Sequence, residues 1–263
     1  MSALSPETVA QLAEHLDQAQ QEARAVEKIT DAHPGLSEDD AYAIQHEIRR
    51  RKQARGARIV GYKAGLTSRA KMRQMGVETP SYGFLADDFA VPDGGEVAHA
   101  GLIHPKVEPE LAFITKAPLR GPGCHMAQVM AATDFVLPAI EIIDSRYRDF
   151  RFDIASVIAD NSSSARFVLG GRMGRPDALD LPTLGMVLEK NGEAVAFGAG
   201  AAVLGHPAAA VAMVVNLLGR RGEELPAGSI VLSGSITEAI AVAAGDAVTL
   251  RTQGLGTLSV RFR

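Results

Sequence analysis

The chain has little cysteine and no excess of positive charge, and each shortage excludes a class of protein. Cys124 is the single cysteine in 263 residues, so the sequence cannot form an internal disulfide framework or a zinc site with several cysteine ligands. Lysine and arginine total 27 against 31 acidic residues, and the net charge of −4 provides no broad basic surface for nucleic acid or an anionic membrane. Hydrophobic residues make up 46% and charged residues 22%, a globular composition that argues against disorder and coiled coil.

Long uncharged runs are also scarce, with one exception between residues 194 and 219, where no Lys, Arg, Asp or Glu occurs. This run is long enough to span a bilayer, but Gly198, Gly200, Gly205 and Pro207 interrupt it and would leave backbone groups unpaired in lipid. We predict a strand or tight loop, then a buried helix that begins at Pro207. The N-terminal residues lack the basic region and apolar stretch of a signal peptide, so we expect a soluble, cytoplasmic protein with no membrane segment.

Residues 1–56 carry the spacing of amphipathic helices. Ser5 and Ser37 each precede acidic residues and a series of apolar residues at helical intervals, which predicts two helices with serine N-caps. The second helix ends in the basic run 49–52, which we interpret as a solvated helix end. The sequence therefore predicts a helical N-terminal region over residues 1–56.

Residues 57–263 have a different texture, in which short apolar runs are broken by glycine and proline. Asn191-Gly192 lies between two such runs and predicts a hairpin turn, and residues 247–262 predict a closing hairpin. Because the strands do not alternate regularly with helices, a doubly wound sheet is disfavoured. We predict an α+β protein with a β-rich domain over residues 57–263.

Three acidic residues occur where the neighbouring sequence predicts burial. Glu108 and Glu110 lie two residues apart in an apparent strand, so both side chains point to one face, and Glu141 lies in the apolar run AIEII. Buried carboxylates need a partner, and three converging carboxylates suit a hard divalent cation such as Mg²⁺ or Mn²⁺. The alternative is that Glu108 and Glu110 line a solvated edge and Glu141 pairs with an arginine such as Arg146. The spacing alone leaves both interpretations open.

Lys63 is a cation within the otherwise uncharged, glycine-punctuated run GYKAGLT. Glycines beside a charge allow a ligand to approach the backbone closely. The alternative is a lysine at a strand end with its amine in water. Serine-rich turns at residues 161–164 and 233–237 offer hydroxyl and amide groups, but neither has the pattern of a nucleophile elbow.

Six ordered segments carry a resemblance to a known family: GYKAGLTSRAKMRQMGVETPSYGFL, HPKVEPELAF, PAIEIIDSRY, DNSSSARFVLG, GAGAAVLGHP and SGSITEAIAV. Together they resemble the 2-hydroxypenta-2,4-dienoate hydratase and 4-oxalocrotonate (2-oxo-3-hexenedioate) decarboxylase family, within the fumarylacetoacetase-like superfamily. The resemblance covers nearly the whole chain. It implies a helical N-terminal region packed on a mixed β-sandwich roll.

The resemblance also implies the composition of the active site. It implies a metal ion, Mg²⁺ or Mn²⁺, and no organic cofactor. The metal ligands that it implies are Glu108, Glu110 and Glu141. It further implies an active-site lysine at Lys63 and substrate contacts from Leu66, Ser162, Ser163 and Thr237.

Ser81 distinguishes the two branches of this family. Hydratases of the family typically carry an acid at this position of the motif that reads TPSYG here, whereas serine leaves room for the second carboxylate of a small dianionic 2-oxo acid. We therefore favour metal-dependent decarboxylation of 2-oxo-3-hexenedioate to 2-hydroxypenta-2,4-dienoate and CO₂ in meta-cleavage degradation of aromatic compounds. Two alternatives remain, a 2-hydroxypenta-2,4-dienoate hydratase and a non-catalytic partner subunit of such a hydratase, because family decarboxylases associate with hydratases.

Overall fold

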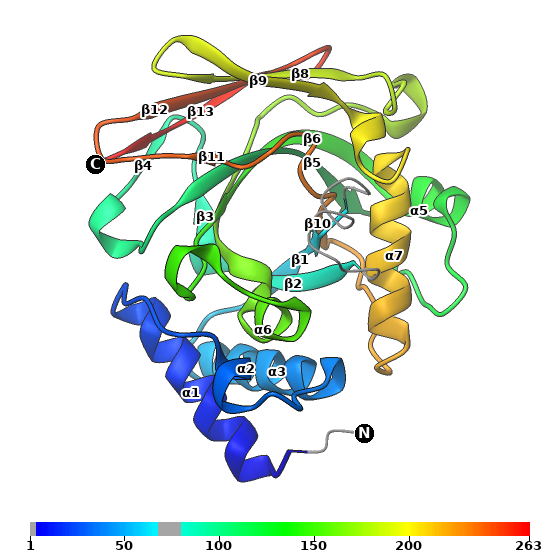
Figure 1. Cartoon of the computed structure of the whole chain (residues 1–263). Helices are drawn as coiled ribbons and strands as arrows, with labels where there is room; N and C mark the ends of the chain where they lie inside the picture. Colours follow the sequence, from blue (N-terminus) through cyan, green and yellow to red (C-terminus); the bar gives the residue numbers. More distant parts are fainter. Residues whose placement is uncertain (1–3, 68–79) are drawn as a thin grey trace.

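Helices gather at one end of the molecule in the computed structural model, which describes residues 4–67 and 80–263 (Figure 1). They are α1 (Pro6–Gln21), α2 (Ile29–Ala32) and α3 (Glu38–Ala54), and α1 packs on α3. Ser5 caps α1 by accepting a hydrogen bond from the first turn, and Ser37 caps α3 through a reciprocal capping box. Both predicted helix starts are therefore confirmed.

The basic end of α3 is only partly solvated. Arg49 forms an ion pair with Glu223 at 2.7 Å, and the Lys52 side chain is buried with its amine 4.8 Å from the centre of the Phe89 ring. The prediction of a solvated helix end is therefore wrong for Lys52. Its apolar stem covers Phe89 because the last turn of α3 packs against the body of the protein.

Two mixed sheets form the body. The larger sheet runs in the order β2-β1-β10-β5-β6-β7-β3, and β11 pairs with β5. Its strands are β1 (Ile59–Gly65), β2 (Ser81–Ala86), β3 (Ala90–Val91), β5 (Lys106–Thr115), β6 (Thr133–Ile143), β7 (Ser164–Leu169), β10 (Ile230–Leu232) and β11 (Ile240–Ala241). The smaller sheet has the order β4-β13-β12-β8-β9. Its strands are β4 (Gly95–Val97), β8 (Gly185–Lys190), β9 (Glu193–Ala199), β12 (Ala247–Thr252) and β13 (Gly256–Phe262).

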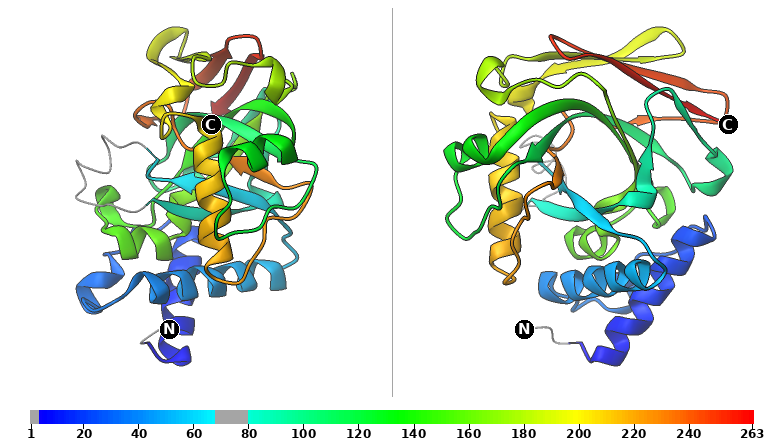
Figure 2. Two further views of the ribbon diagram at one scale, coloured as in Figure 1. Left: turned by 90° about the vertical axis from the view of Figure 1, so that its right-hand side faces the viewer. Right: turned by 180° about the vertical axis from the view of Figure 1, so that it is seen from behind.

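The larger sheet curves around the centre of the molecule, between the N-terminal helices and the smaller sheet (Figures 1 and 2). The pairs β1–β10, β3–β7 and β4–β13 are parallel, whereas β5 and β6 form a long antiparallel pair. The predicted α+β fold with mixed sheets is confirmed.

Both predicted hairpins are present. Asn191 and Gly192 connect β8 to β9 with φ angles of 55° and 84°, as a tight hairpin turn requires. In the closing hairpin, Val248 pairs with Val260 and Leu250 with Leu258, so that one face of β12 and β13 is buried.

Within residues 80–263, three further α-helices connect the strands: α5 (Met126–Ala132), α6 (Ile154–Ala159) and α7 (Pro207–Gly219). The stretch Gly200–Gly219 is long and apolar enough to cross a membrane by length and composition, but half of it is buried inside the fold. Because α7 packs against β1, β2 and α5, it is a core helix, and the predicted helix start at Pro207 is confirmed. The helix α6 packs against α3 and so joins the N-terminal helices to the sheets.

Candidate active site

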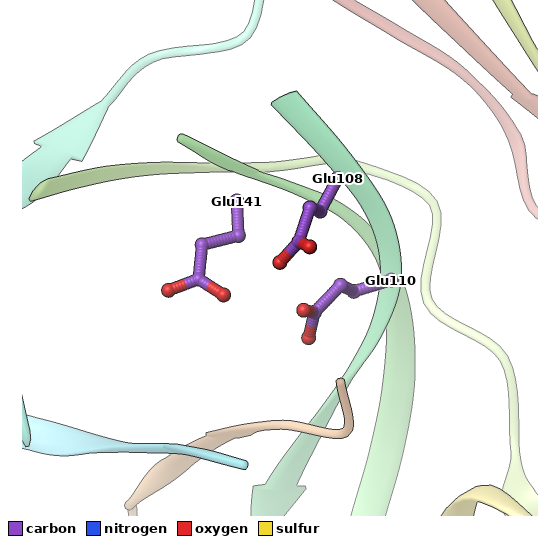
Figure 3. A group of neighbouring side chains, drawn as sticks. All are labelled: Glu108, Glu110 and Glu141. Atoms are coloured by element: carbon purple, nitrogen blue, oxygen red, sulfur yellow. The ribbon is translucent and has the colours of Figure 1, made fainter. Parts of the chain in front are cut away.

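Three carboxylates converge on the concave side of the larger sheet. The antiparallel register places Glu108 of β5 directly opposite Glu141 of β6, and Glu110 follows two residues along β5 on the same face. Each residue offers one carboxylate oxygen, and these three atoms lie within 4.8 Å of one another. The side chains point toward a common centre (Figure 3). Their exposed fractions are 6% for Glu108 and 0% for Glu110 and Glu141.

The donor set fits a divalent metal ion. Among the described residues, Oε1 of Glu110 and Oε1 of Glu141 are buried without a hydrogen-bond partner. Buried carboxylate oxygens without partners are unfavourable unless a cation neutralises them, and oxygen ligands are those that Mg²⁺ and Mn²⁺ prefer. Arg146 does not supply this cation, because it pairs with Asp160. The alternative in which Arg146 neutralises Glu141 is therefore wrong.

Gly234 completes the environment of Glu110. Its backbone N–H donates a hydrogen bond of 2.7 Å to Glu110 Oε2. Gly234 has a φ angle of +95°, and a Cβ atom there would lie 2.1 Å from Thr67 Oγ1. Only glycine permits this close approach of the backbone to the carboxylate.

Lys63 links the carboxylates to a serine turn. From β1 its amine lies 3.1 Å from Glu141 Oε2 and donates a hydrogen bond of 3.0 Å to the carbonyl oxygen of Ser162. Its exposed fraction is 3%, so the alternative of an amine in water is wrong. The buried lysine partly offsets the charge of the three carboxylates.

The pKa values reflect this excess of negative charge. Burial and repulsion from Glu141 and Glu108 raise the pKa of Glu110 well above its ordinary value of 4.5. Burial raises the pKa of Glu141 to about 7, although Lys63 opposes the change. Burial alone would lower the pKa of Lys63, but the three carboxylates raise it above 10.5. One lysine is therefore insufficient to balance three ionised carboxylates.

The serine turn has an unusual backbone. Asn161, Ser162 and Ser163 have φ angles of 49°, 50° and 59°, three consecutive residues in the left-handed region. The Asn161 amide accepts a hydrogen bond of 2.8 Å from the backbone N–H of Phe84 and donates one of 3.0 Å to its carbonyl. This pair of bonds fixes the turn against β2 and orients the Ser162 carbonyl toward Lys63.

A buried arginine supports the turn from behind. Arg146 contacts the carboxylate and the backbone carbonyl of Asp160, and it donates hydrogen bonds of 2.8 Å and 3.2 Å to the carbonyls of Asp144 and Ser164. The backbone N–H of Asp144 in turn donates a hydrogen bond of 2.8 Å to the carbonyl oxygen of Ser163. These contacts hold the turn in its left-handed conformation. Backbone strain of this kind persists only where the surrounding structure fixes it in this way.

A cavity of about 420 Å³ opens over these groups. The predicted residues that line it are Lys63, Leu66, Ser81, Glu108, Ser162, Ser163 and Thr237. Ser81 Oγ and Ser162 Oγ lie 3.1 Å apart, and Ser163 Oγ is buried without a hydrogen-bond partner among the described residues. Glu110 and Glu141 are fully buried and join the site through Glu108 and Lys63.

The cavity also contains residues that the sequence reasoning missed. Lys106, Phe150 and Phe152 are three of them. The alternation that puts Glu108 and Glu110 on one face extends to Lys106, so this lysine could have been found from the sequence. The two phenylalanines have no such signal, because they lie in an irregular segment before α6.

Residues 59–263 match the fumarylacetoacetate (FAA) hydrolase C-terminal family. The chain therefore belongs to the fumarylacetoacetate hydrolase family, and the site described above lies within the matched part. The match covers both sheets and excludes the N-terminal helical region.

Within this family the chain is similar to 4-oxalocrotonate decarboxylases. It is 59% identical to 4-oxalocrotonate decarboxylase of Pseudomonas sp. (strain CF600) over 98% of both chains. A solved structure, 4-oxalocrotonate decarboxylase from Pseudomonas putida G7 complexed with magnesium and adipate, superposes with a TM-score of 0.98 at 57% identity over 100% of both chains. Identity to 2-hydroxyhexa-2,4-dienoate hydratase of Comamonas testosteroni is lower, 41% over 95% of both chains.

Proposed function

We propose that the chain is a metal-dependent carboxy-lyase that converts 2-oxo-3-hexenedioate to 2-hydroxypenta-2,4-dienoate and CO₂. The observation that carries this proposal is the buried cluster of Glu108, Glu110 and Glu141 beside Lys63, at the base of a cavity that fits a small acid. The three glutamates are the proposed metal ligands. Residues 57–263 form the proposed catalytic domain, with residues 1–56 as a helical region packed against it.

Three observations support the decarboxylase branch. Identity to decarboxylases reaches 59%, against 41% for a hydratase. The similar structure from P. putida G7 contains adipate, a six-carbon dicarboxylate like the proposed substrate. At Ser81 the cavity wall of this chain carries a neutral side chain, which does not repel a second substrate carboxylate.

The reaction breaks the bond between C5 and C6. Its electron pair forms the C4–C5 double bond, the C3–C4 π electrons shift to C2–C3, and the C2 carbonyl oxygen gains the negative charge and then a proton. A bound Mg²⁺ or Mn²⁺ supplies Lewis acidity toward the 2-oxo acid end of the substrate. The products are CO₂ and the dienol.

Lys63 is the proposed catalytic residue. Its amine is protonated, buried and held by Glu141 and Ser162, so its position is fixed before the substrate binds. A preorganised cation in a water-poor site stabilises developing enolate charge more strongly than the same cation in water. Lys63 is also the ammonium group available to protonate the C2 oxygen. Leu66, Ser162, Ser163 and Thr237 are the proposed substrate contacts.

The test is an assay of purified protein with 2-oxo-3-hexenedioate and Mg²⁺, in which CO₂ and the dienoate are measured separately. We expect both products in equal amounts, and no turnover in excess chelator. A hydratase would instead consume 2-hydroxypenta-2,4-dienoate without releasing CO₂, and a non-catalytic subunit would do neither. Full activity in excess chelator would contradict metal dependence.

We propose that the chain acts in the cytoplasm, in the meta-cleavage degradation of aromatic compounds. Its dienol product is unstable and is the substrate of a 2-hydroxypentadienoate hydratase, so direct association with such a hydratase would limit loss of the dienol. Co-elution of the two purified proteins in size-exclusion chromatography tests the association, and independent elution at micromolar concentrations would argue against it.

A further inference from the structure

The cavity contains a second lysine that has no task in the reaction described above. Lys106 is the first residue of β5, and the alternation of the strand puts its side chain on the same face as Glu108 and Glu110. Two residues of an antiparallel strand span roughly 6.8 Å. Lys106 therefore lies one step farther from the centre of the carboxylate cluster than Glu108, and it lines the cavity.

The surroundings of Lys106 are apolar. Its amine lies 4.1 Å from the centre of the Phe150 ring, and Ile143 is its partner across the β5–β6 ladder. Among the described residues no carboxylate forms an ion pair with Lys106. The amine is thus held over an aromatic ring at the cavity, where a charge interacts more strongly than in water.

Phe150 is placed in a strained conformation that supports this contact. Asp149 and Phe150 have φ angles of 56° and 55°, a region that side chains of this size rarely adopt. The His104 ring packs against Phe150 with 4.6 Å between ring centres. Strain of this kind persists where packing over-determines it, and it concentrates at ligand sites.

The charges of the described residues motivate a look at the other cation of the cavity. Among these residues, the three carboxylates and Lys63 together with a bound dication sum to zero, so this set alone does not attract a dianionic substrate. In the proposed reaction the 2-oxo acid end of the substrate faces the metal ligands, so its other carboxylate would lie at the far end of a six-carbon chain. Among the described residues that line the cavity, Lys106 and Lys63 are the two cations, and Lys63 is already engaged with Glu141.

We propose that Lys106, supported by the Phe150 ring, binds the distal carboxylate of the substrate and makes the enzyme selective for dicarboxylates. This inference rests on the proposed function, because it takes the substrate to be a six-carbon 2-oxo dicarboxylate. The distal carboxylate loses its charge when it departs as CO₂, so the contact is stronger in the ground state than in the transition state. Lys106 therefore lowers KM and also lowers kcat.

The test compares two ligands that differ only in the distal group, 2-oxoadipate and 2-oxohexanoate. Their dissociation constants are measured by calorimetry on the Mg²⁺-loaded full chain, for the wild type and for Lys106→Met, Lys106→Gln and Lys106→Arg. Lys116→Met is the matched control, because Lys116 follows the other end of β5 and lies outside the cavity. Steady-state kinetics with 2-oxo-3-hexenedioate accompany the binding measurements.

We expect the wild type to prefer 2-oxoadipate by roughly 10- to 100-fold, the range for a hydrogen bond to a charged group. Lys106→Met and Lys106→Gln should lose this preference, raise KM by a similar factor and raise kcat rather than lower it. Lys106→Arg should retain part of the preference, and Lys116→Met all of it. Comparable affinity of the wild type for the two ligands, or an unchanged preference in the folded Met and Gln variants, would overturn the inference. Equal weakening of both ligands would also overturn it.

The binding arm does not depend on turnover. A wild type that binds 2-oxoadipate selectively through Lys106 but releases no CO₂ would contradict the proposed reaction and leave the assignment of Lys106 intact. Normal decarboxylation together with an unchanged ligand preference in Lys106→Met would support the proposed reaction and overturn the assignment of Lys106.

Discussion

The buried carboxylate cluster predicts that one substitution stabilises the metal-free protein and destabilises the metal-loaded protein. Glu110 is fully buried, and its Oε1 has no hydrogen-bond partner among the described residues. Glu110→Gln removes one charge from the cluster and keeps the shape of the side chain. The amide oxygen can still accept the hydrogen bond that Gly234 donates to Oε2.

The size of the stability change can be estimated from the distances between the carboxylate oxygens. Ligand oxygens within 4.8 Å of one another repel by roughly 3 kcal/mol for each fully ionised pair at an effective dielectric constant near 20. Because the pKa of Glu110 is raised in the folded state, its contribution to stability is fully present below pH 4.5 and is lost as the pH rises through the folded pKa. In chelator at pH 8 we therefore expect Glu110→Gln to raise the free energy of unfolding by roughly 1–3 kcal/mol, or about 2–4 °C in Tm for each kcal/mol.

With Mg²⁺ bound, we expect the wild type to become more stable than Glu110→Gln. At 1,000 times its dissociation constant, Mg²⁺ stabilises the wild type by about 4.1 kcal/mol, and a variant that lacks one ligand binds too weakly to gain most of this. The assay is thermal unfolding of both proteins at pH 4.5 and pH 8, with chelator and with Mg²⁺. Glu224→Gln is the control, because it removes an equal charge from an exposed ion pair with Arg120. A Glu110→Gln protein that is less stable than wild type in chelator at pH 8, or that gains the full Mg²⁺ shift, would refute the reasoning.

Three further substitutions test other parts of the structure. Lys63→Ala should keep its circular dichroism spectrum but lose roughly 10²- to 10⁴-fold in kcat/KM, the usual contribution of a positioned proton donor, and near-normal kinetics would remove Lys63 from the chemistry. Ser81→Asp should raise KM for the dianion, because a new carboxylate about 4 Å from a substrate carboxylate repels it by roughly 4 kcal/mol, whereas unchanged kinetics would show that Ser81 does not face the substrate. Burial lowers the pKa of Lys52 to about 8, so Lys52→Met should raise the free energy of unfolding in urea by about 1–3 kcal/mol at pH 7. This gain should shrink by pH 10, because the stability that Lys52 contributes is present above pH 10.5 and lost as the pH falls through 8; an equal gain at both pH values would contradict it.

The sequence predicted features that depend on local periodicity. Glu108 and Glu110 share a face because a strand alternates, and the Asn191-Gly192 turn forms because asparagine and glycine tolerate positive φ. The same rule would have assigned Lys106 to the cavity. The sequence alone does not single out Lys106, since a lysine at the end of a strand is usually solvated.

The pairing of Lys63 with Glu141 could not be predicted in this way. Lys63 lies on β1 and Glu141 on β6, and β10 and β5 lie between these strands in the sheet. Nothing local in GYKAGL indicates that the sheet curves enough to bring the two side chains within 3.1 Å. The curvature comes from the order of strands that are distant in the chain, and only the family resemblance linked Lys63 to the acids.

The backbone around the cavity shows why local rules fail at this site. Leu66, Phe150, Ser162 and Ser163 all line the cavity, and each has a φ angle between 50° and 59°. Leucine, phenylalanine and serine do not favour this region, so each position costs on the order of 1–3 kcal/mol that the surrounding packing must offset. Glycine at these positions would relieve the strain, but it would also remove the side chains that shape the cavity and loosen the turn that holds the Ser162 carbonyl on Lys63. The conformations are therefore maintained by tertiary contacts, such as the buried network of Arg146, and no local pattern records them.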